Sequence, residues 1–250
     1  MSALRSVFAV PDYRRLWGAR TVSQWGDTFR FVALAVVVYR LTGSGLGVAG
    51  VVVAEILPVL LLAPLAGVLV DRVPRVAVLV VSDVVRAVLA GVLALRHGDV
   101  VTVYAVAFGM SAASVFFNPA AQSVLPSLVR PEQLPAANSG IWTTAVLSQV
   151  VLAPAAGGLV VSVGPGWAFA LDSVTYLVSG AVLIGLRLRE PPREVGRRRL
   201  VADAREGANV VATDPMLRAL ALGQLLAALS AGATSALLVV LGPLLLLRFV

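Results

Sequence analysis

The sequence contains no cysteine and no lysine, and it has a single histidine, His97. Without cysteine there can be no disulfides, thiolate metal sites or cysteine nucleophiles. One histidine, next to Asp99 in an expected loop, leaves a metal centre almost no ligands. All 20 basic residues are therefore arginine, and we expect neither a metal nor another cofactor.

Charged residues are scarce as well. They make up 13% of the 250 residues, while 59% are hydrophobic and the mean hydropathy is +0.92. A soluble domain usually carries about 25% charged residues, so lipid must be the solvent for much of this chain. The net charge of +7 does not indicate nucleic-acid binding, because the arginines lie between apolar stretches. The N-terminus lacks a short apolar stretch with a cleavage site, so we expect no signal peptide.

Seven apolar stretches are long enough to cross a bilayer, since about 20 helical residues span roughly 30 Å of hydrocarbon. They are residues 17–39, 46–70, 76–95, 100–122, 138–163, 167–186 and 219–247. Glycine, proline and charged residues occupy the breaks between them. The sequence predicts an all-α integral membrane protein whose main partner is the lipid bilayer.

The arginines outside the spans predict its orientation. Up to the start of the seventh span, Arg40 and Arg96 lie on one side, whereas fourteen lie on the other: Arg5, Arg14, Arg15, Arg72, Arg75, Arg130, Arg187, Arg189, Arg193, Arg197, Arg198, Arg199, Arg205 and Arg218. Cytoplasmic loops carry the arginine excess. We therefore expect a multi-pass protein of the cell inner (plasma) membrane, with its N-terminus in the cytoplasm.

The sequence contains an internal repeat. Residues 62–70 and 152–160 match at seven of nine positions at an offset of 90, and Asp83 parallels Asp172 at an offset of 89. This offset equals three spans, an odd number, so the second copy is inverted in the membrane. Inverted repeats are typical of secondary transporters. We predict a six-helix bundle of two inverted three-helix repeats, with Pro64 and Pro154 as counterparts, plus a seventh transmembrane helix.

A short motif follows the second span, and it consists of Gly67, Asp71, Arg72 and Arg75. It resembles the major facilitator signature between helices 2 and 3, although Pro74 and Val76 depart from that pattern. The resemblance implies a cytoplasmic gate. Gly67 would let its helix approach a neighbour closely, and Asp71 would meet a helix N-terminus or a basic side chain on closure. A charged turn set only by topology would explain the arginines but not Gly67 and Asp71.

The fifth span partly fits the antiporter signature of helix 5 through Gly140, Pro154, Gly157 and Gly158. Small residues and a proline there would permit close packing and a bend. Other stretches resemble the drug, macrolide and siderophore exporters of the superfamily, namely residues 8–17, 26–27 and 117–122.

That family has twelve helices in two halves, and the resemblance covers only the first part. We therefore expect a truncated twelve-helix transporter. Residues 1–186 would form the N-terminal six-helix half, 187–218 a cytoplasmic linker, and 219–250 the seventh helix. Within the linker, apolar residues recur at helical spacing, which fits either an amphipathic helix on the inner leaflet or a solvated segment.

Ionisable side chains within the spans need a cavity or a partner, because each is costly in lipid. Asp27 and Glu55 lie roughly 15 Å and 14 Å from the nearest span end, near mid-membrane. A carboxyl there can bind and release a proton in the physiological range. Asp27 has an alternative, a static pair with Arg30 one turn along. Glu55 has no cation within one turn, which favours a proton-carrying or substrate-facing role.

The remaining polar residues have plainer interpretations. Asp83 and Arg86, spaced i, i+3, are expected to form a structural ion pair. Asp172 is expected to act at a helix start. Several residues could line a substrate cavity, although packing and interface anchoring explain each as well: Asn118, Gln122, Gln149, Trp142 and Tyr176.

The resemblance implies a secondary active transporter, with proton-driven efflux of a small amphipathic or hydrophobic compound by alternating access. An uptake permease and a truncated product that transports nothing remain alternatives. An intramembrane enzyme is disfavoured, because no serine–histidine arrangement, histidine cluster or cysteine lies within the spans. The sequence does not give the oligomeric state.

Overall fold

A computed structural model describes residues 2–188, 209–224, 226–227 and 230. The described elements are helices, in the order α1 (Ser2–Phe8), α2 (Pro11–Thr42), α3 (Gly45–Arg72), α4 (Arg75–Leu95), α5 (Val100–Leu128), the short 3₁₀ helix η1 (Pro131–Gln133), α6 (Leu134–Ser162) and α7 (Pro165–Ile184). The all-α expectation is confirmed for this part of the chain. Residues 209–213 and 215–224 are also helical and exposed.

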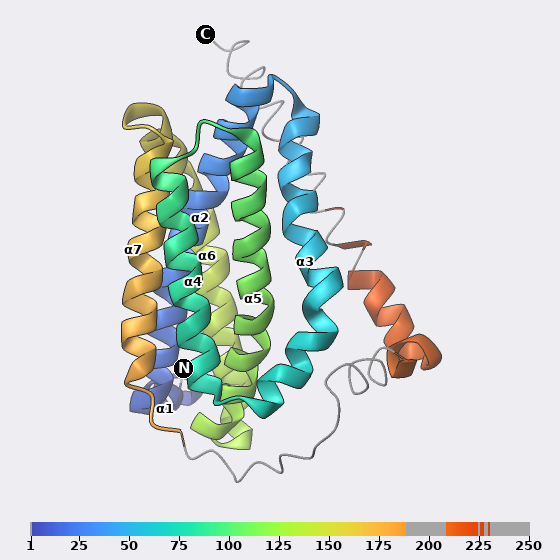
Figure 1. Ribbon diagram of the computed structural model, residues 1–250. Helices are drawn as coiled ribbons and strands as arrows, with labels where there is room; N and C mark the ends of the chain where they lie inside the picture. Colours follow the sequence, from blue (N-terminus) through green and yellow to red (C-terminus); the bar gives the residue numbers. More distant parts are fainter. Residues whose placement is uncertain (1, 189–208, 225, 228–229, 231–250) are drawn as a thin grey trace.

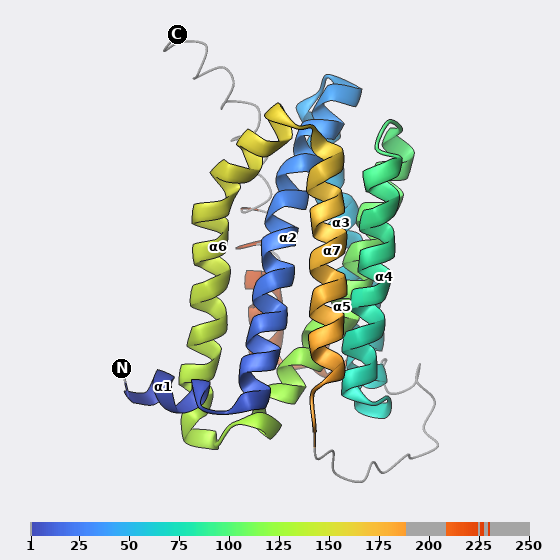
Figure 2. The same cartoon turned by 90° about the vertical axis from the view of Figure 1, so that its left-hand side faces the viewer.

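Helices α2 to α7 run side by side as one bundle, and α1 lies across its foot (Figures 1 and 2). Five stretches are long and apolar enough to cross a membrane: α3, α4, α5, α7, and η1 together with α6. Helix α2 has 32 residues but carries charges along its middle. It lies within the same bundle and packs mainly on α6 and α7. Its charges therefore face protein rather than lipid.

The packing follows the predicted repeat. The first repeat would be α2, α3 and α4, and the second α5, α6 and α7, so α2 corresponds to α5, α3 to α6, and α4 to α7. Under this correspondence the α2–α7 contact is equivalent to the α5–α4 contact, and the α3–α5 contact is equivalent to the α6–α2 contact. All four belong to the most extensive contacts of the described bundle, as does α4–α7, which this correspondence leaves unchanged. Helices α2 to α7 therefore form two three-helix repeats.

The two matched prolines occupy equivalent places, as predicted. Pro64 is the twentieth residue of α3, and Pro154 is the twenty-first of α6. Both helices bend along their length (Figures 1 and 2). A proline inside a helix removes one backbone hydrogen bond and commonly causes such a bend.

The helix bounds agree with the predicted spans to within a few residues, with two exceptions. Helix α2 begins at Pro11 rather than 17, and α5 continues to Leu128 rather than 122. The predicted seventh helix falls almost entirely outside the described residues, and so does the linker from 189 to 208.

Two apolar clusters form the core, one toward each end of the bundle. The first gathers Leu16, Leu79, Phe117 and Leu183 with their neighbours. The second gathers Leu34, Leu93, Met110 and Phe169 with theirs. Buried polar residues lie near the middle of α2, α4 and α7, among them Thr28, Asp83, Arg86, Asp172 and Ser179. A polar layer therefore crosses the middle of the bundle.

Two polar side chains begin helices at the end of the bundle predicted to be external. The Ser44 side chain accepts from the Leu46 N–H at the start of α3. The Asp99 carboxylate accepts from the backbone N–H and the hydroxyl of Thr102 at the start of α5. These bonds lower the pKa of Asp99, because they favour its ionised form. Such caps satisfy N–H groups that have no partner within the helix.

Candidate functional site

The guanidinium of Arg30 is shared by carboxyls from three helices. Its Nη1 donates to Glu55 of α3 at 2.7 Å, and its Nη2 donates to Asp27 of its own helix at 3.3 Å. Its Nε lies 3.4 Å from Asp172 of α7. The Arg30 side chain is 13% exposed, so these contacts largely replace water. The sequence left open whether Arg30 pairs statically with Asp27, and the structure shows that its shortest contact is with Glu55.

Asp172 is the most deeply buried of these carboxyls. Its side chain is 0% exposed, against 28% for Asp27 and 24% for Glu55. Within the described residues, neither carboxyl oxygen of Asp172 has a hydrogen-bond partner. It is the eighth residue of α7, past the first turn. The expected helix-start role of Asp172 is therefore wrong, because its side chain points into the bundle instead of capping the helix.

A glycine allows α2 and α7 to meet at this level. A Cβ added to Gly26 would lie 2.0 Å from the hydroxyl of Thr175 and 3.0 Å from the Cα of Asp172. No ordinary side chain fits in that space. Gly26 therefore sets the distance at which Arg30 and Asp172 face each other.

Tyr176 connects this cluster to a second ion pair. Its hydroxyl donates to Asp27 at 2.5 Å, and its ring lies 4.4 Å from the Arg86 guanidinium. Arg86 also lies over Phe117 at 4.2 Å and donates to Asp83. The other Asp83 oxygen accepts from Ser179 at 2.6 Å. The expected Asp83–Arg86 pair is confirmed as a contact, but it belongs to a network rather than standing alone.

The network holds more acid than base. Four carboxyls, those of Asp27, Glu55, Asp83 and Asp172, contact two guanidiniums, those of Arg30 and Arg86. Arg20, also on α2, lies close enough to Arg86 to be repelled by it and adds a third positive charge. Even so, four carboxylates would outnumber the cations. An unbalanced charge is costly in this setting, so the arrangement favours binding of at least one proton.

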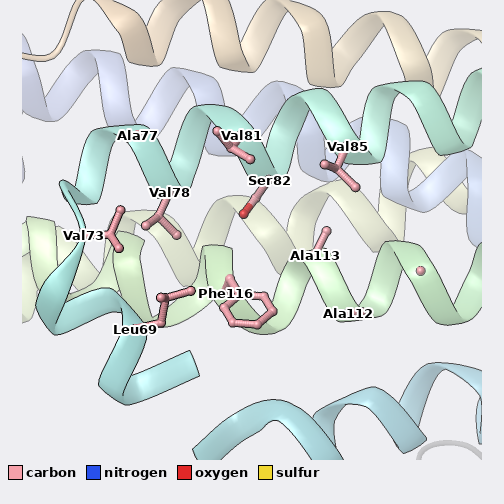
Figure 3. A pocket seen from close by; sticks show the side chains of 11 residues that line it. Leu69, Val73, Ala77, Val78, Val81, Ser82, Val85, Ala112, Ala113 and Phe116 are labelled. Atoms are coloured by element: carbon pink, nitrogen blue, oxygen red, sulfur yellow. The ribbon is translucent and has the colours of Figure 1, made fainter. Parts of the chain in front are cut away.

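An apolar cleft lies apart from these ions, between the end of α3 and the facing sides of α4 and α5 (Figure 3). It has a volume of about 420 Å³. Leu69, Val73, Val81 and Phe116 are among its lining residues, and the hydroxyl of Ser82 is the one polar side-chain group among them. The cleft can hold a hydrocarbon group but offers little to orient a polar one.

Comparison with known proteins identifies the family. A family model described as a transmembrane secretion effector, within the MFS group, matches residues 3–246. The chain belongs to the major facilitator superfamily.

Two relatives of this major facilitator chain come from different bacteria. The putative bacilysin exporter BacE of Bacillus subtilis is 32% identical over 146 residues, which cover 57% of this chain and 36% of the exporter. The uncharacterized MFS-type transporter y4rN of Sinorhizobium fredii is 34% identical over 239 residues, which cover 92% of this chain and 57% of that protein. The chain thus spans between about a third and somewhat over half of these relatives. It is a transporter-family protein, as the resemblance implied.

The major facilitator motif after α3 lies at the α3–α4 turn. Asp71 is exposed near the end of α3, and Arg75 begins α4. The Nη1 of Arg75 donates to the Ser123 carbonyl of α5 at 3.2 Å, which ties this turn to a third helix. A Cβ added to Gly67 would meet no atom of the described residues within 4 Å. The expected close approach at Gly67 is therefore absent from this part of the structure, because Gly67 lies on an exposed face of α3.

The antiporter-like motif of the fifth span lies on α6, and within the described part of the chain only one of its glycines is closely packed. Gly140 lies against Tyr13 of α2, whose hydroxyl would be 2.7 Å from an added Cβ. Trp17 donates to Thr144 at 3.1 Å beside it, so close packing at Gly140 is confirmed. Gly157 and Gly158 have no such neighbour among the described residues, and Pro154 is exposed.

The expected cavity residues Asn118 and Gln122 are exposed on α5 and lie outside the ion network. The sequence indicated Tyr176 only as a candidate cavity residue, and the structure places it in the ion network instead. The sequence missed Ser179 and misread Asp172. The repeat did contain a signal for Asp172, because it aligned this residue with Asp83. Both aspartates prove to be buried in the polar layer.

Proposed function

We propose that this chain forms the proton-binding part of a secondary active exporter, an antiporter that moves a small amphipathic or hydrophobic compound out of the cell. The observation that carries the proposal is the polar layer, in which carboxyls from α2, α3, α4 and α7 outnumber the guanidiniums they contact. In a membrane the surplus negative charge would cost about 3 kcal/mol per carboxylate. A bound proton removes that cost.

The position of the layer suits alternating access. Its carboxyls lie near the middle of the bundle, with packed apolar residues toward each end. In such transporters, coupling sites lie near the bilayer midplane, where repeats meet. Arg30 and Asp172 meet here from α2 and α7, the first helix of one repeat and the last helix of the other. Adding or removing a proton changes the attraction between these helices.

The direction and the substrate class are inferred from relatives. BacE is named as a putative bacilysin exporter, which supports efflux rather than uptake for this chain. The apolar cleft of about 420 Å³ provides room for hydrocarbon near the α3–α4 turn. We assign the protein to the inner membrane with its N-terminus in the cytoplasm, on the arginine distribution. Residues 1–186 would be its transporter half, 187–218 its linker and 219–250 its seventh helix.

Transport into proteoliposomes tests the proposal. The full-length protein encoded by the gene is reconstituted into liposomes whose interior is made acidic. Uptake of ethidium, a lipophilic cation, is then followed by fluorescence. We expect uptake that collapses when a proton ionophore abolishes the gradient. Glu55→Gln imitates the protonated side chain, so this variant should still bind ethidium but lose uphill uptake.

Two further variants sharpen the assay. Asp27→Asn alone leaves Arg30 with one partner fewer, so it is combined with Arg30→Gln, and this double variant should also lose uphill uptake. Glu132→Gln is the matched control, because Glu132 is an exposed acid in η1, and its uptake should equal that of the wild type. Normal pH-driven uptake by Glu55→Gln, by the double variant and by Asp172→Asn would refute proton coupling through this layer.

A further inference from the structure

Asp172 receives the least compensation of the carboxyls around Arg30. Glu55 accepts a hydrogen bond at 2.7 Å, and Asp27 accepts one from Arg30 and one from Tyr176. Asp172 has only the Arg30 Nε at 3.4 Å, without hydrogen-bond geometry, and it is fully buried. A carboxylate needs donors when water is excluded, whereas a neutral carboxylic acid needs far fewer.

The elements packed around Asp172 supply no other cation to balance it directly. Helix α2 presents Asp27 and Arg30, with Arg20 further along. Helix α4 presents Asp83 and Arg86, and Arg86 is already held by Asp83. Helix α3 presents Glu55, and α7 itself presents Tyr176. Helices α5 and α6 contain no acidic or basic residue. The nearest positive charge is therefore Arg30, and Glu55 and Asp27 already engage it.

We propose that Asp172 is the carboxyl that holds the proton in this arrangement, and that its deprotonation draws Arg30 away from Glu55. The step is a simple acid dissociation: the O–H bond of the acid breaks, the proton passes to water, and the electron pair stays on the carboxylate. A buried carboxylate is best satisfied by two parallel N–H donors from one edge of a guanidinium. The Arg30 Nε now lies 3.4 Å from Asp172 without hydrogen-bond geometry, so Arg30 must turn toward Asp172 to present such an edge, and turning weakens its present bond to Glu55.

The exchange has a structural effect because the three carboxyls belong to different helices. With Asp172 protonated, Arg30 joins α2 to α3 through Glu55. With Asp172 ionised, Arg30 would join α2 to α7. The contact between α2 and α3 is among the less extensive of the bundle, whereas α3 packs firmly on α5. Proton loss thus frees α3 and α5 to shift together relative to α2. This inference deepens the proposed function by naming its proton site.

Infrared spectroscopy of the purified chain in lipid tests the assignment without any transport. A protonated carboxyl gives a carbonyl stretching band separate from that of carboxylates. At neutral pH we expect one such band in the wild type. It should shift when the protein is made with carboxyl-labelled [¹³C]aspartate and stay in place with labelled glutamate. Asp172→Asn should abolish it at neutral pH, while Asp27→Asn and Asp83→Asn, which each remove a neighbouring negative charge, should keep the band but shift its disappearance to lower pH.

The exchange of Arg30 is tested by titration. Glu55→Gln removes a carboxylate that competes with Asp172 for Arg30. The same carboxylate also repels an ionised Asp172. The band should therefore disappear at a lower pH in this variant than in the wild type. A residue with only a packing role would not respond to Glu55 in this way. The control Glu132→Gln should leave the titration unchanged.

Each contrary result overturns the proposal. A band that shifts with labelled glutamate, or that survives Asp172→Asn at neutral pH, places the proton elsewhere. An unchanged titration in Glu55→Gln refutes the exchange. The labelling needs no substitution, so it decides between aspartate and glutamate even if Asp172→Asn fails to fold. If the band belongs to Asp172 but no pH-driven uptake occurs, the proposed function fails while this assignment stands.

Discussion

Replacing Gly26 with alanine adds one methyl group where α2 and α7 meet. The new Cβ would lie 2.0 Å from Thr175 Oγ1, 2.5 Å from Asp172 Oδ1 and 3.0 Å from the Asp172 Cα. Thr175 could turn aside, but its hydroxyl would then lose its 2.7 Å bond to the Asp172 carbonyl. The backbone contact cannot be relieved by a side-chain rotation. The two helices must therefore move apart.

The magnitude follows from these contacts. Overpacking a well-filled interior costs about 1–3 kcal/mol, and losing the Thr175 hydrogen bond costs about 1 kcal/mol more. Alanine regains about 1 kcal/mol over glycine as a helix former. We expect Gly26→Ala to lower the free energy of unfolding by about 1–3 kcal/mol, the net of these terms.

Gly18→Ala is the matched control. Gly18 lies in the same helix, and a Cβ there would meet no atom of the described residues within 4 Å. That change should keep only the propensity gain, about 1 kcal/mol of stabilisation. Both variants are unfolded in mixed detergent micelles by increasing the SDS fraction, with far-UV circular dichroism as the signal. Equal free energies of unfolding for the two variants would refute the close contact between α2 and α7.

Three other predictions concern topology, the gate and a helix cap. A reporter enzyme fused after Gly98 or Gly164 should read external, and one fused after Pro74 or Pro131 cytoplasmic; a cytoplasmic signal at Gly164 would contradict the inverted repeat. Asp71→Asn should slow transport at least several-fold in proteoliposomes while leaving membrane insertion intact, since Asp71 is exposed near the α3–α4 turn, and wild-type rates would reduce the motif to a topology signal. Asp99→Ala should lower the thermal stability at neutral pH, because the folded state holds the pKa of Asp99 below its unfolded value. This stabilisation is present above the unfolded pKa of about 3.9 and is lost as the pH falls through the folded pKa. The melting temperatures of the variant and the wild type should therefore converge in acid.

The fold was largely predictable because lipid imposes a simple rule on the sequence. Each span needs about 20 apolar residues, and breaks such as Gly43 and Gly164 are marked by positive φ angles that favour glycine. The errors came where that rule is incomplete. Helix α2 begins early, at Pro11, because Tyr13 and Trp17 bury against α6 rather than facing lipid. Helix α5 continues through Pro119 and Pro126, because within a membrane bundle neighbouring helices and side chains can satisfy the backbone groups that proline leaves unpaired.

The candidate site was predictable in depth but not in its partners. Residue counting placed Asp27 and Glu55 near mid-membrane, and the structure brings both to Arg30. Residue counting could not show that Arg30 also faces Asp172, because the rotation of each helix about its axis depends on packing across the bundle. The position of Gly26 against Thr175 fixes that rotation, and no local pattern in the sequence reveals it.

The shared guanidinium of Arg30 also bears on how the chain enters the membrane. On insertion scales an arginine or aspartate at a helix centre costs about 2.5–3.5 kcal/mol, and α2 carries Arg20, Asp27 and Arg30 in its middle. Asp27 is made just before Arg30, Glu55 is made 25 residues after it, and Asp172 emerges from the ribosome last. Helix α2 is therefore poorly suited to leave the translocon alone. We therefore expect α2 to be fully stabilised in lipid only after α3 and then α7 have been inserted and have brought Glu55 and Asp172 to Arg30.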